Sequence, residues 1–530
     1  MLVCLTHIFL VAACAGTDSR PHILFLLADD LGWNDVSYHN GMSGPGATFT
    51  PTIDRLASEG VKLSSYYVNP ICSPTRASIM TGRYTIRTGI SHHCYENMTG
   101  LPRNERLLPQ AMREAGYETW LTGKWHLGFS ERYMIPSERG FDYTYGHYHA
   151  CVDAFNHTSG NACTPEECKG VDWTRAESGS DPVVAFAERG QHTTHLIVQE
   201  IDNLLEMRHR RASTKPVFLY VPFHMVHEGS GNGALSWPLS GFDAEELQAP
   251  KHYVDAVPSS VTDPKRRVFV AMVTLLDEAI RNITKLFEDR GLWNNTITIF
   301  STDNGSPFDG RGQVGNLPLR GQKHELYEGG IHVPAFVHGV GVPVGQTSDS
   351  LIAHVDWFPT IVRLTGGSTS QELPLDGLDQ WASIVAGRAS RTELLHNYDL
   401  STSLVKNFIG ALRMGDYKLI RFGGKENGEH TSELYDIKAD PAEKHNLRHN
   451  ASFAHIYERM QKRIDELAKE VVPCWCNESS PIPGVCAGTG FSGDCDKNQP
   501  TCSKSDIPRA YLPGWCANEA IDSLPRAISV

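Results

Sequence analysis

The chain has 530 residues, of which 40% are hydrophobic and 21% are charged, and its formal net charge at pH 7 is −13. This composition is typical of a globular protein, and the length predicts one large domain with a smaller one beside it. An acidic chain has no basic excess to neutralise phosphates, which excludes a general affinity for nucleic acids or anionic membranes. An anionic substrate must therefore be bound by a local cluster of cations.

The first residues indicate secretion. Residues 2–15 form an apolar run that ends in Ala13-Cys14-Ala15, which predicts a signal peptide over residues 1–16. The run is too short to span a bilayer, and no later segment has 18 uninterrupted apolar residues, so we expect no membrane span. We predict a protein of the secretory pathway, with the lysosome and the extracellular space as alternatives.

Cysteines and glycosylation sequons agree with secretion. Of the thirteen cysteines, two lie in the predicted signal peptide, and setting Cys72 aside leaves ten. An even number fits disulfides formed in an oxidising compartment. Asn-X-Ser/Thr sequons, which predict a glycoprotein, begin at Asn97, Asn156, Asn282, Asn294, Asn450 and Asn477.

An apolar run at residues 22–28 has the pattern of a strand buried on both faces of a parallel sheet. Asp29 and Asp30 follow it directly. Open α/β sheets bind ligands beyond the carboxyl ends of their strands. We therefore predict that this pair binds a metal, with a solvated loop as the alternative.

A short helix is expected over 53–60, and Cys72 then stands between Pro70 and Pro74. Prolines on both sides predict an irregular turn at Cys72, before a helix that begins near residue 77. The thiol would then face a helix N-terminus, where free amides favour an anion.

After a predicted helix over 107–115, residues 117–128 are expected to be extended. Lys124 and His126 are two positions apart, so an extended backbone would point both side chains to one side. Two cations on one face favour an anion between them. An edge strand with a solvated face is the alternative.

The middle of the chain supplies further candidates. Residues 140–190 predict a disulfide-tied loop region, followed by a helix over 194–208 and a buried strand over 216–222. His224 and His227 lie just beyond that strand. Position favours His227 as the functional residue, although a histidine taken at random is more often structural. The Gly- and Ser-rich stretch 229–247 resembles an inserted loop at the mouth of the site.

A helix over 269–287 and a third buried strand over 296–301 precede Asp303 and Asn304. Two strands would thus bring hard oxygen donors to one edge of the sheet, and such donors favour Ca²⁺ or Mg²⁺ over zinc. Lys323 stands among glycines that let the backbone come close; taken alone it would be a solvated charge.

The expected elements define an α/β protein whose catalytic domain spans residues 20–390. A strand over 333–338 and a helix over 354–364 close this domain. A smaller α+β domain is expected over 391–473, with a Cys-rich tail over 474–530. Its predicted elements are strands at 408–414, 417–422 and 432–437 and a helix at 453–472.

Between about residues 22 and 447 the chain resembles the sulfatase family, and most of all its arylsulfatase B (N-acetylgalactosamine 4-sulfatase) branch. Several motifs occur in the family's order, which makes the resemblance specific. They are Leu-Ala-Asp-Asp-Leu-Gly-Trp from Leu27, the stretch 72–89 with its C-x-P-x-R-x-x-x-x-T-G string, Gly-Lys-Trp-His-Leu-Gly from Gly123, Val-His-Glu from Val226, Ser-Thr-Asp-Asn-Gly from Ser301 and Leu-Arg-Gly-Gln-Lys from Leu319.

The resemblance implies an alkaline-phosphatase-like sulfatase fold, in which a large mixed, mostly parallel sheet is flanked by helices. It also implies that a formylglycine-generating enzyme oxidises Cys72 to formylglycine during secretion. One Ca²⁺ per chain would then be held by Asp29, Asp30, Asp303, Asn304 and the modified residue 72. The sulfate would be surrounded by Arg76, Lys124, His126, His227 and Lys323.

A mechanism follows as a hypothesis. A hydrated formylglycine has two hydroxyl groups, and one of them, with Asp303 as base, would attack sulfur. His227, with Lys323 beside it, would protonate the departing alcohol. The second hydroxyl group, deprotonated by His126, would then expel sulfate and restore the aldehyde.

The substrate is left open by two departures from the family pattern. Gly229 and the insertion replace a proline expected after His227, and the Cys-rich tail does not match. A glycosaminoglycan or other carbohydrate sulfate is favoured, with a small aryl sulfate or glucosinolate as the alternative. Two other interpretations remain. One is a phosphoesterase, and the other is a non-catalytic protein that binds sulfated glycans in the same site and keeps Cys72 as an unmodified thiol. The oligomeric state also stays open.

Overall fold

The computed structural model describes residues 20–40, 47–91, 100–129, 131–159, 170–229, 247–307, 315–398, 408–423 and 430–472. The predicted signal peptide, the Cys-rich tail, the sequons at Asn97 and Asn477 and almost all of the predicted insertion lie outside these ranges. The domain boundary at 390/391 stays a prediction.

In the described residues, ten strands form one sheet in the order β13-β2-β12-β11-β1-β10-β4-β5-β8-β9. The central strands β11 to β5 run parallel to one another, whereas antiparallel pairs occur toward both edges. The predicted mixed, mostly parallel sheet is therefore confirmed. In sheet order the strands are β13 (Gln346–Ser348), β2 (Val61–Leu63), β12 (Phe336–Gly339), β11 (Thr296–Thr302), β1 (His22–Ala28), β10 (Val217–Pro222), β4 (Glu118–Lys124), β5 (Tyr143–His147), β8 (Thr174–Glu177) and β9 (Val183–Val184).

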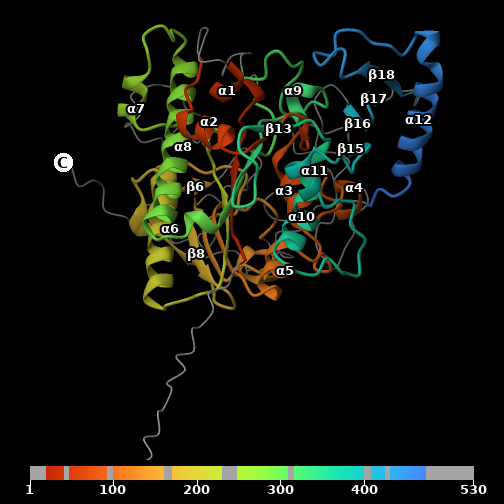
Figure 1. Ribbon diagram of the computed structural model, residues 1–530. Coiled ribbons are helices and arrows are strands. Elements are labelled where there is room, and N and C mark those ends of the chain that lie inside the picture. The colour runs from red at the N-terminus through yellow and green to blue at the C-terminus, as the bar shows by residue number, and fades with distance from the viewer. Residues whose placement is uncertain are drawn as a thin grey trace, which may run out of the picture.

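Helices cover both faces of this sheet. Leu24 and Leu26 of β1 belong to the core on one face, and Ile23 and Phe25 belong to the core on the other. This arrangement explains why β1 and β10 have apolar residues on both faces rather than at alternate positions. The helices of the first face are α2 (Pro51–Ser58), α6 (Thr193–Arg210) and α8 (Pro264–Asp289), and those of the second are α3 (Cys72–Thr81), α5 (Leu108–Glu114) and α10 (Trp357–Leu364) (Figure 1).

The region 140–190 differs from its prediction as a loop region, because its described part contributes β5, β8 and β9 to the large sheet. Glycine is the physical reason. A Cβ atom on Gly146 would lie 2.0 Å from the carbonyl oxygen of Gly123, and one on Gly123 would lie 2.1 Å from that of Pro222. Strands β10, β4 and β5 approach each other only because these positions are glycines, which in a sequence indicate turns.

A second, antiparallel sheet follows in the order β15-β16-β17-β18. Met460, Ile464 and Leu467 of α12 are buried against it, which confirms the predicted smaller α+β unit, seen at the right in Figure 1. β15 is additional to the predicted strands. The elements are β15 (Glu393–Tyr398), β16 (Phe408–Met414), β17 (Tyr417–Phe422), β18 (Thr431–Asp436) and α12 (Ala454–Ala468).

A buried ionic cluster joins this second sheet to the rest of the protein. Lys418 of β17 lies 2.8 Å from Glu328 and 2.9 Å from Glu443, and all three side chains are buried. Glu328 begins α9 (Glu328–Ile331), which follows the segment that carries Lys323. The two sheets are therefore fixed to each other close to the candidate site.

The remaining helices and strands are short. They are α1 (Ser37–Asn40), α4 (Thr85–Thr88), α7 (Lys251–Ala256), α11 (Trp381–Ala386), β3 (Tyr66–Tyr67), β6 (Thr158–Ser159), β7 (Gly170–Val171) and β14 (Ile352–Ala353). None of the helices in the described ranges combines the length and apolar character that a membrane span requires.

Candidate active site

The carboxyl ends of β1 and β11 bring four oxygen-bearing side chains together, as predicted. Asp29 and Asp30 follow β1, Asp303 and Asn304 follow β11, and all four are fully buried. The two segments are hydrogen-bonded, since Asp303 N donates to Ala28 O at 3.2 Å and Asp30 N donates to Asp303 Oδ1 at 3.3 Å. The parallel register of the two strands thus places these side chains at one edge of the sheet.

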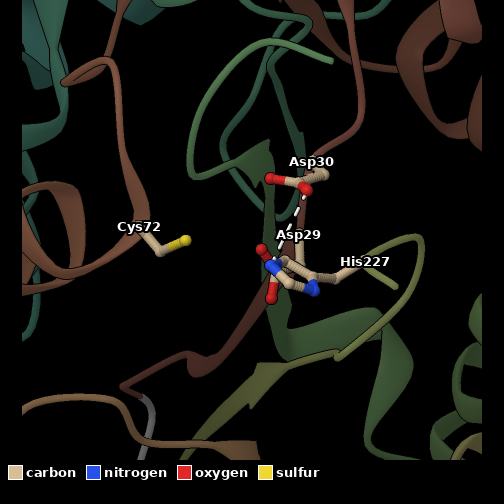
Figure 2. Close-up of side chains that lie close together, drawn as sticks. All are labelled: Asp29, Asp30, Cys72 and His227. Carbon is tan, nitrogen blue, oxygen red and sulfur yellow. Dashed lines mark ion pairs between the residues drawn. The ribbon is translucent and has the colours of Figure 1, made fainter. Parts of the chain in front are cut away.

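Cys72 reaches the same edge from α3, although not in the predicted irregular turn. It is the first residue of the helix, with Ile71 as an extended N-cap. Pro74 is compatible with the first turn because the first amides of a helix need no internal acceptor. The predicted place of Cys72 at a helix N-terminus is correct. Figure 2 shows its sulfur pointing toward Asp29, Asp30 and His227.

The distances fit a metal site. One ligand atom from each of Asp29, Asp30, Cys72 and His227 lies within 4.8 Å of the others. Within the described residues, neither Asp29 Oδ1 nor Asn304 Oδ1 has a hydrogen-bond partner, although both atoms are buried. Buried oxygens without donors are the ligands that a hard cation uses. The residues present therefore fit a Ca²⁺ or Mg²⁺ ion.

Each carboxylate is paired with a buried cation. Arg76 donates from Nη2 to Asp303 Oδ2 at 2.7 Å, and Lys124 Nζ lies 2.6 Å from Asp29 Oδ2. Lys323 Nζ lies 2.8 Å from Asp30 Oδ1. All three predicted cations are therefore brought to the site.

Burial governs the protonation of these groups. It raises the pKa of Asp303 to about 7, with the charge of Asp29 adding to this and Arg76 opposing it. Burial also raises the pKa of the Cys72 thiol to about 12, against the attraction of Lys124 and Lys323. Burial alone would lower the pKa of Lys124, but the charges of Asp29, Cys72 and Asp303 together outweigh burial, and the pKa is raised. Lys124 is therefore a permanent cation.

His227 contacts both Lys323 and Asp30. Its Nδ1 lies 2.8 Å from the carbonyl oxygen of Glu228, so Nδ1 carries the proton and Nε2 is an acceptor. Nε2 lies 3.1 Å from Lys323 Nζ and 3.8 Å from Asp30 Oδ2, the contact marked by the dashed line in Figure 2. Burial, together with Lys323, holds the pKa of His227 well below its usual range.

His126 also lies beside the helix that carries Cys72, but for a different reason from the predicted one. Strand β4 ends at Lys124, and His126 follows with a left-handed φ of 55°. Its carbonyl oxygen accepts a hydrogen bond of 3.1 Å from Ser73 Oγ, which fixes it against the start of α3. The argument from an extended backbone is therefore wrong, although the residue lies near the site.

Two histidines next to the site were missed or ranked second. His147 is the last residue of β5, a strand that the sequence did not reveal, and it pairs with Lys124 in the sheet register. His224 follows β10, and its ring stacks on that of His227 with centroids 5.4 Å apart. Gly146 lies inside β5, but a glycine in a sequence usually indicates a turn, so neither β5 nor His147 at its end was predicted.

A buried set of oxygen ligands and cations, beside a helix N-terminus at the carboxyl edge of a parallel sheet, defines a hydrolase of anionic esters. The chain belongs to the sulfatase family: the Sulfatase family model matches residues 21–368, and the model described as N-sulphoglucosamine sulphohydrolase, C-terminal, matches residues 321–470. It is accordingly a sulfuric ester hydrolase of the arylsulfatase type, and the predicted family is confirmed.

Individual relatives agree with this family. Arylsulfatase J of Mus musculus is 33% identical over 503 residues, which cover 87% of this chain and 78% of that protein. N-acetylgalactosamine-6-sulfatase of Mus musculus is 29% identical over 432 residues, which cover 79% of this chain and 75% of that protein. The crystal structure of Ps i-CgsB has the same fold, with a TM-score of 0.70 and 24% identity over 86% of this chain and 94% of that one.

Proposed function

We propose that this sulfatase removes sulfate from carbohydrates by means of a formylglycine made from Cys72 and one Ca²⁺ ion. The observation that carries the proposal is the position of Cys72, whose sulfur lies within 4.8 Å of a carboxylate oxygen of Asp29 and of Asp30 in one buried cluster. A residue that must supply a nucleophile needs this proximity to the groups that neutralise the sulfate.

The ligands proposed for Ca²⁺ are Asp29, Asp30, Asp303, Asn304 and the modified side chain at 72. The ion would act as a Lewis acid that withdraws charge from the sulfate oxygens. It would also add two positive charges to carboxylates that are already paired with Arg76, Lys124 and Lys323. The resulting positive site suits an anionic ester.

The chain's own residues divide the remaining work. Lys124 and Arg76 would hold the sulfate oxygens, and Asp303 would accept the proton of the attacking hydroxyl group. Lys323 donates to Nε2 of His227 in this structure, so the two side chains hold a proton that the departing alcohol can take. His126 would accept the proton of the second hydroxyl group when sulfate leaves.

The substrate proposed is a sulfated carbohydrate, and a small sulfate ester such as an aryl sulfate or a glucosinolate is the alternative. A relative named N-acetylgalactosamine-6-sulfatase supports the first. The apolar run at 2–15 and the numerous cysteines support a lysosomal or secreted protein that meets a formylglycine-generating enzyme in the secretory pathway.

Two measurements on the secreted protein test this proposal. Mass spectrometry of the tryptic peptide that ends at Arg76 should show an aldehyde in place of the thiol. Desulfation of galactosamine 4-sulfate, heparin fragments and aryl sulfates should exceed hydrolysis of aryl phosphate. An intact thiol with glycan binding but no turnover would identify a non-catalytic binding protein, and a preference for phosphate would identify a phosphoesterase.

A further inference from the structure

Three buried histidine rings form a row beside the reacting centre. The rings of His147 and His224 have centroids 5.2 Å apart, and those of His224 and His227 are 5.4 Å apart. His227, together with Lys323, holds the proton proposed for the departing alcohol. Because the departing alcohol must lie next to His227, the rings of His224 and His147 continue the row away from that alcohol.

This row has hydrogen-bonding capacity that the proposed mechanism does not use. Within the described residues, Nε2 of His224 and both ring nitrogens of His147 have no hydrogen-bond partner. His147 is 1% exposed and His224 is 5% exposed. Buried polar atoms are nearly always paired, so such a group of unpaired nitrogens indicates a ligand.

Both rings are neutral. Burial, followed by the charge of Lys124, lowers the pKa of His224 to about 3, and burial together with His224 holds that of His147 well below its usual range. A neutral imidazole has one N–H donor and one acceptor. A main-chain hydrogen bond to Glu228 raises the pKa of His224, as an acceptor carbonyl does, so its N–H is used there and Nε2 is the acceptor.

The burial of these histidines and the packing of His147 on Trp173 are compatible with a row that contacts the substrate. His224 and His227 are 5% and 6% exposed, whereas Cys72 and Lys124 have no exposed surface. The two histidines are therefore slightly less buried than Cys72 and Lys124. The ring of His147 is held from behind by Trp173, with centroids 5.8 Å apart and an interplanar angle of 20°.

We propose that His224 and His147 bind a free hydroxyl group on the carbon next to the sulfate ester, an assignment that rests on the proposed function. A hydroxyl group donates to Nε2 of His224 and accepts from the N–H of His147. A second sulfate or a carboxylate has no proton to donate, and a simple aryl group has neither function. The site therefore selects sulfated polyols, of which carbohydrates are the common class.

Two substrates that differ by one hydroxyl group test the assignment. Cyclohexyl sulfate and the cis and trans monosulfates of cyclohexane-1,2-diol share the same kind of leaving group, so the contribution of His227 is the same for each. For the wild type we expect kcat/KM to be about 5- to 100-fold higher for one diol isomer, the effect of satisfying a buried polar group.

His224→Phe keeps the stacked ring and removes the acceptor. It should lower the diol rate to that of cyclohexyl sulfate while leaving the latter within about threefold, and His147→Phe should act in the same direction. His224→Gln retains an acceptor and should keep part of the preference. His338→Phe is the matched control, because His338 lies on β12 against Trp293 and pairs with the early part of β11.

The outcomes separate the alternatives. A wild type that prefers neither diol isomer, or a His224→Phe variant that keeps the preference, overturns the assignment. Equal losses on both substrates mean that the row is structural or binds water, and also overturn it. If the wild type hydrolyses neither these esters nor aryl sulfate, the proposed function itself fails, and this assignment fails with it.

Discussion

Replacing Lys124 by methionine should weaken the metal-free protein and strengthen its binding of Ca²⁺. Lys124 Nζ lies 2.6 Å from Asp29 Oδ2, and neither side chain is exposed. Removing one partner of a buried ion pair destabilises a protein by about 3–5 kcal/mol. The low end, about 3 kcal/mol, applies here because Arg76 remains 3.5 Å from the same oxygen.

This loss of stability can be converted into an expected fall in the melting temperature. An unfolding entropy of about 2.1 cal/mol/K per residue gives on the order of 1 kcal/mol/K for 530 residues, and therefore a fall of about 3 °C in metal-free Lys124→Met. Methionine preserves the length and apolar character of the stem, so the change isolates the charge. Lys285→Met is the matched control, since its pair with Asp289 is more than half exposed and should matter by less than about 0.5 kcal/mol.

The same substitution removes a cation that repels the ion. Unit charges 4 Å apart at the effective dielectric constant of a protein interact by about 4 kcal/mol, and a divalent ion doubles this. Even about 1.4 kcal/mol of relief tightens Kd tenfold. Calorimetric titration of Ca²⁺ into both proteins measures this. Affinity that is unchanged or weaker in Lys124→Met would show that the ion does not share this pocket.

Three further predictions concern chemistry and pH. Cys72→Ser should release at most one alcohol per enzyme and Cys72→Ala none, as counted in a stopped assay; sustained turnover by the serine variant would contradict the mechanism. His227→Gln should lower kcat for alkyl sulfates by about 10²- to 10⁴-fold and that for 4-nitrophenyl sulfate far less, because nitrophenolate leaves without a proton; equal losses would argue against proton donation. Burial and the charge of Glu328 raise the pKa of Glu443 to about 7, although Lys418 opposes the shift. Between the ordinary pKa of a glutamate and pH 7, the folded protein therefore binds a proton that the unfolded chain has lost. The stability that this proton provides is lost as the pH rises through 7. The melting temperature should therefore fall more steeply in the wild type than in Glu443→Gln between about pH 5 and pH 8, and parallel profiles would refute the assignment.

The sequence predicted the strands that are buried on both faces of the sheet. Strands buried on both faces appear as apolar runs in β1 and β10 and as a run rich in Thr and Ile in β11, so these strands and the acidic residues beyond β1 and β11 could be found directly. It did not reveal β5, because Gly146 permits a contact that only the folded sheet displays. His147 was missed for the same reason.

Local signals also misplaced residues at the site itself. Prolines around Cys72 indicated a turn, yet Pro74 lies within the first turn of α3. Position along the chain gave no indication that His126 takes a left-handed conformation. The pairing of Arg76 with Asp303 joins two segments that are distant in the sequence, so only the folded structure, which brings α3 to the residues after β11, reveals it.

Helix α3 is buried along its whole length, and its first residue has no exposed surface. An enzyme that oxidised Cys72 could not reach it once the chain had collapsed. The proposed conversion must therefore happen on a nascent, still extended polypeptide. A molecule that folds before this conversion would keep its thiol and stay inactive.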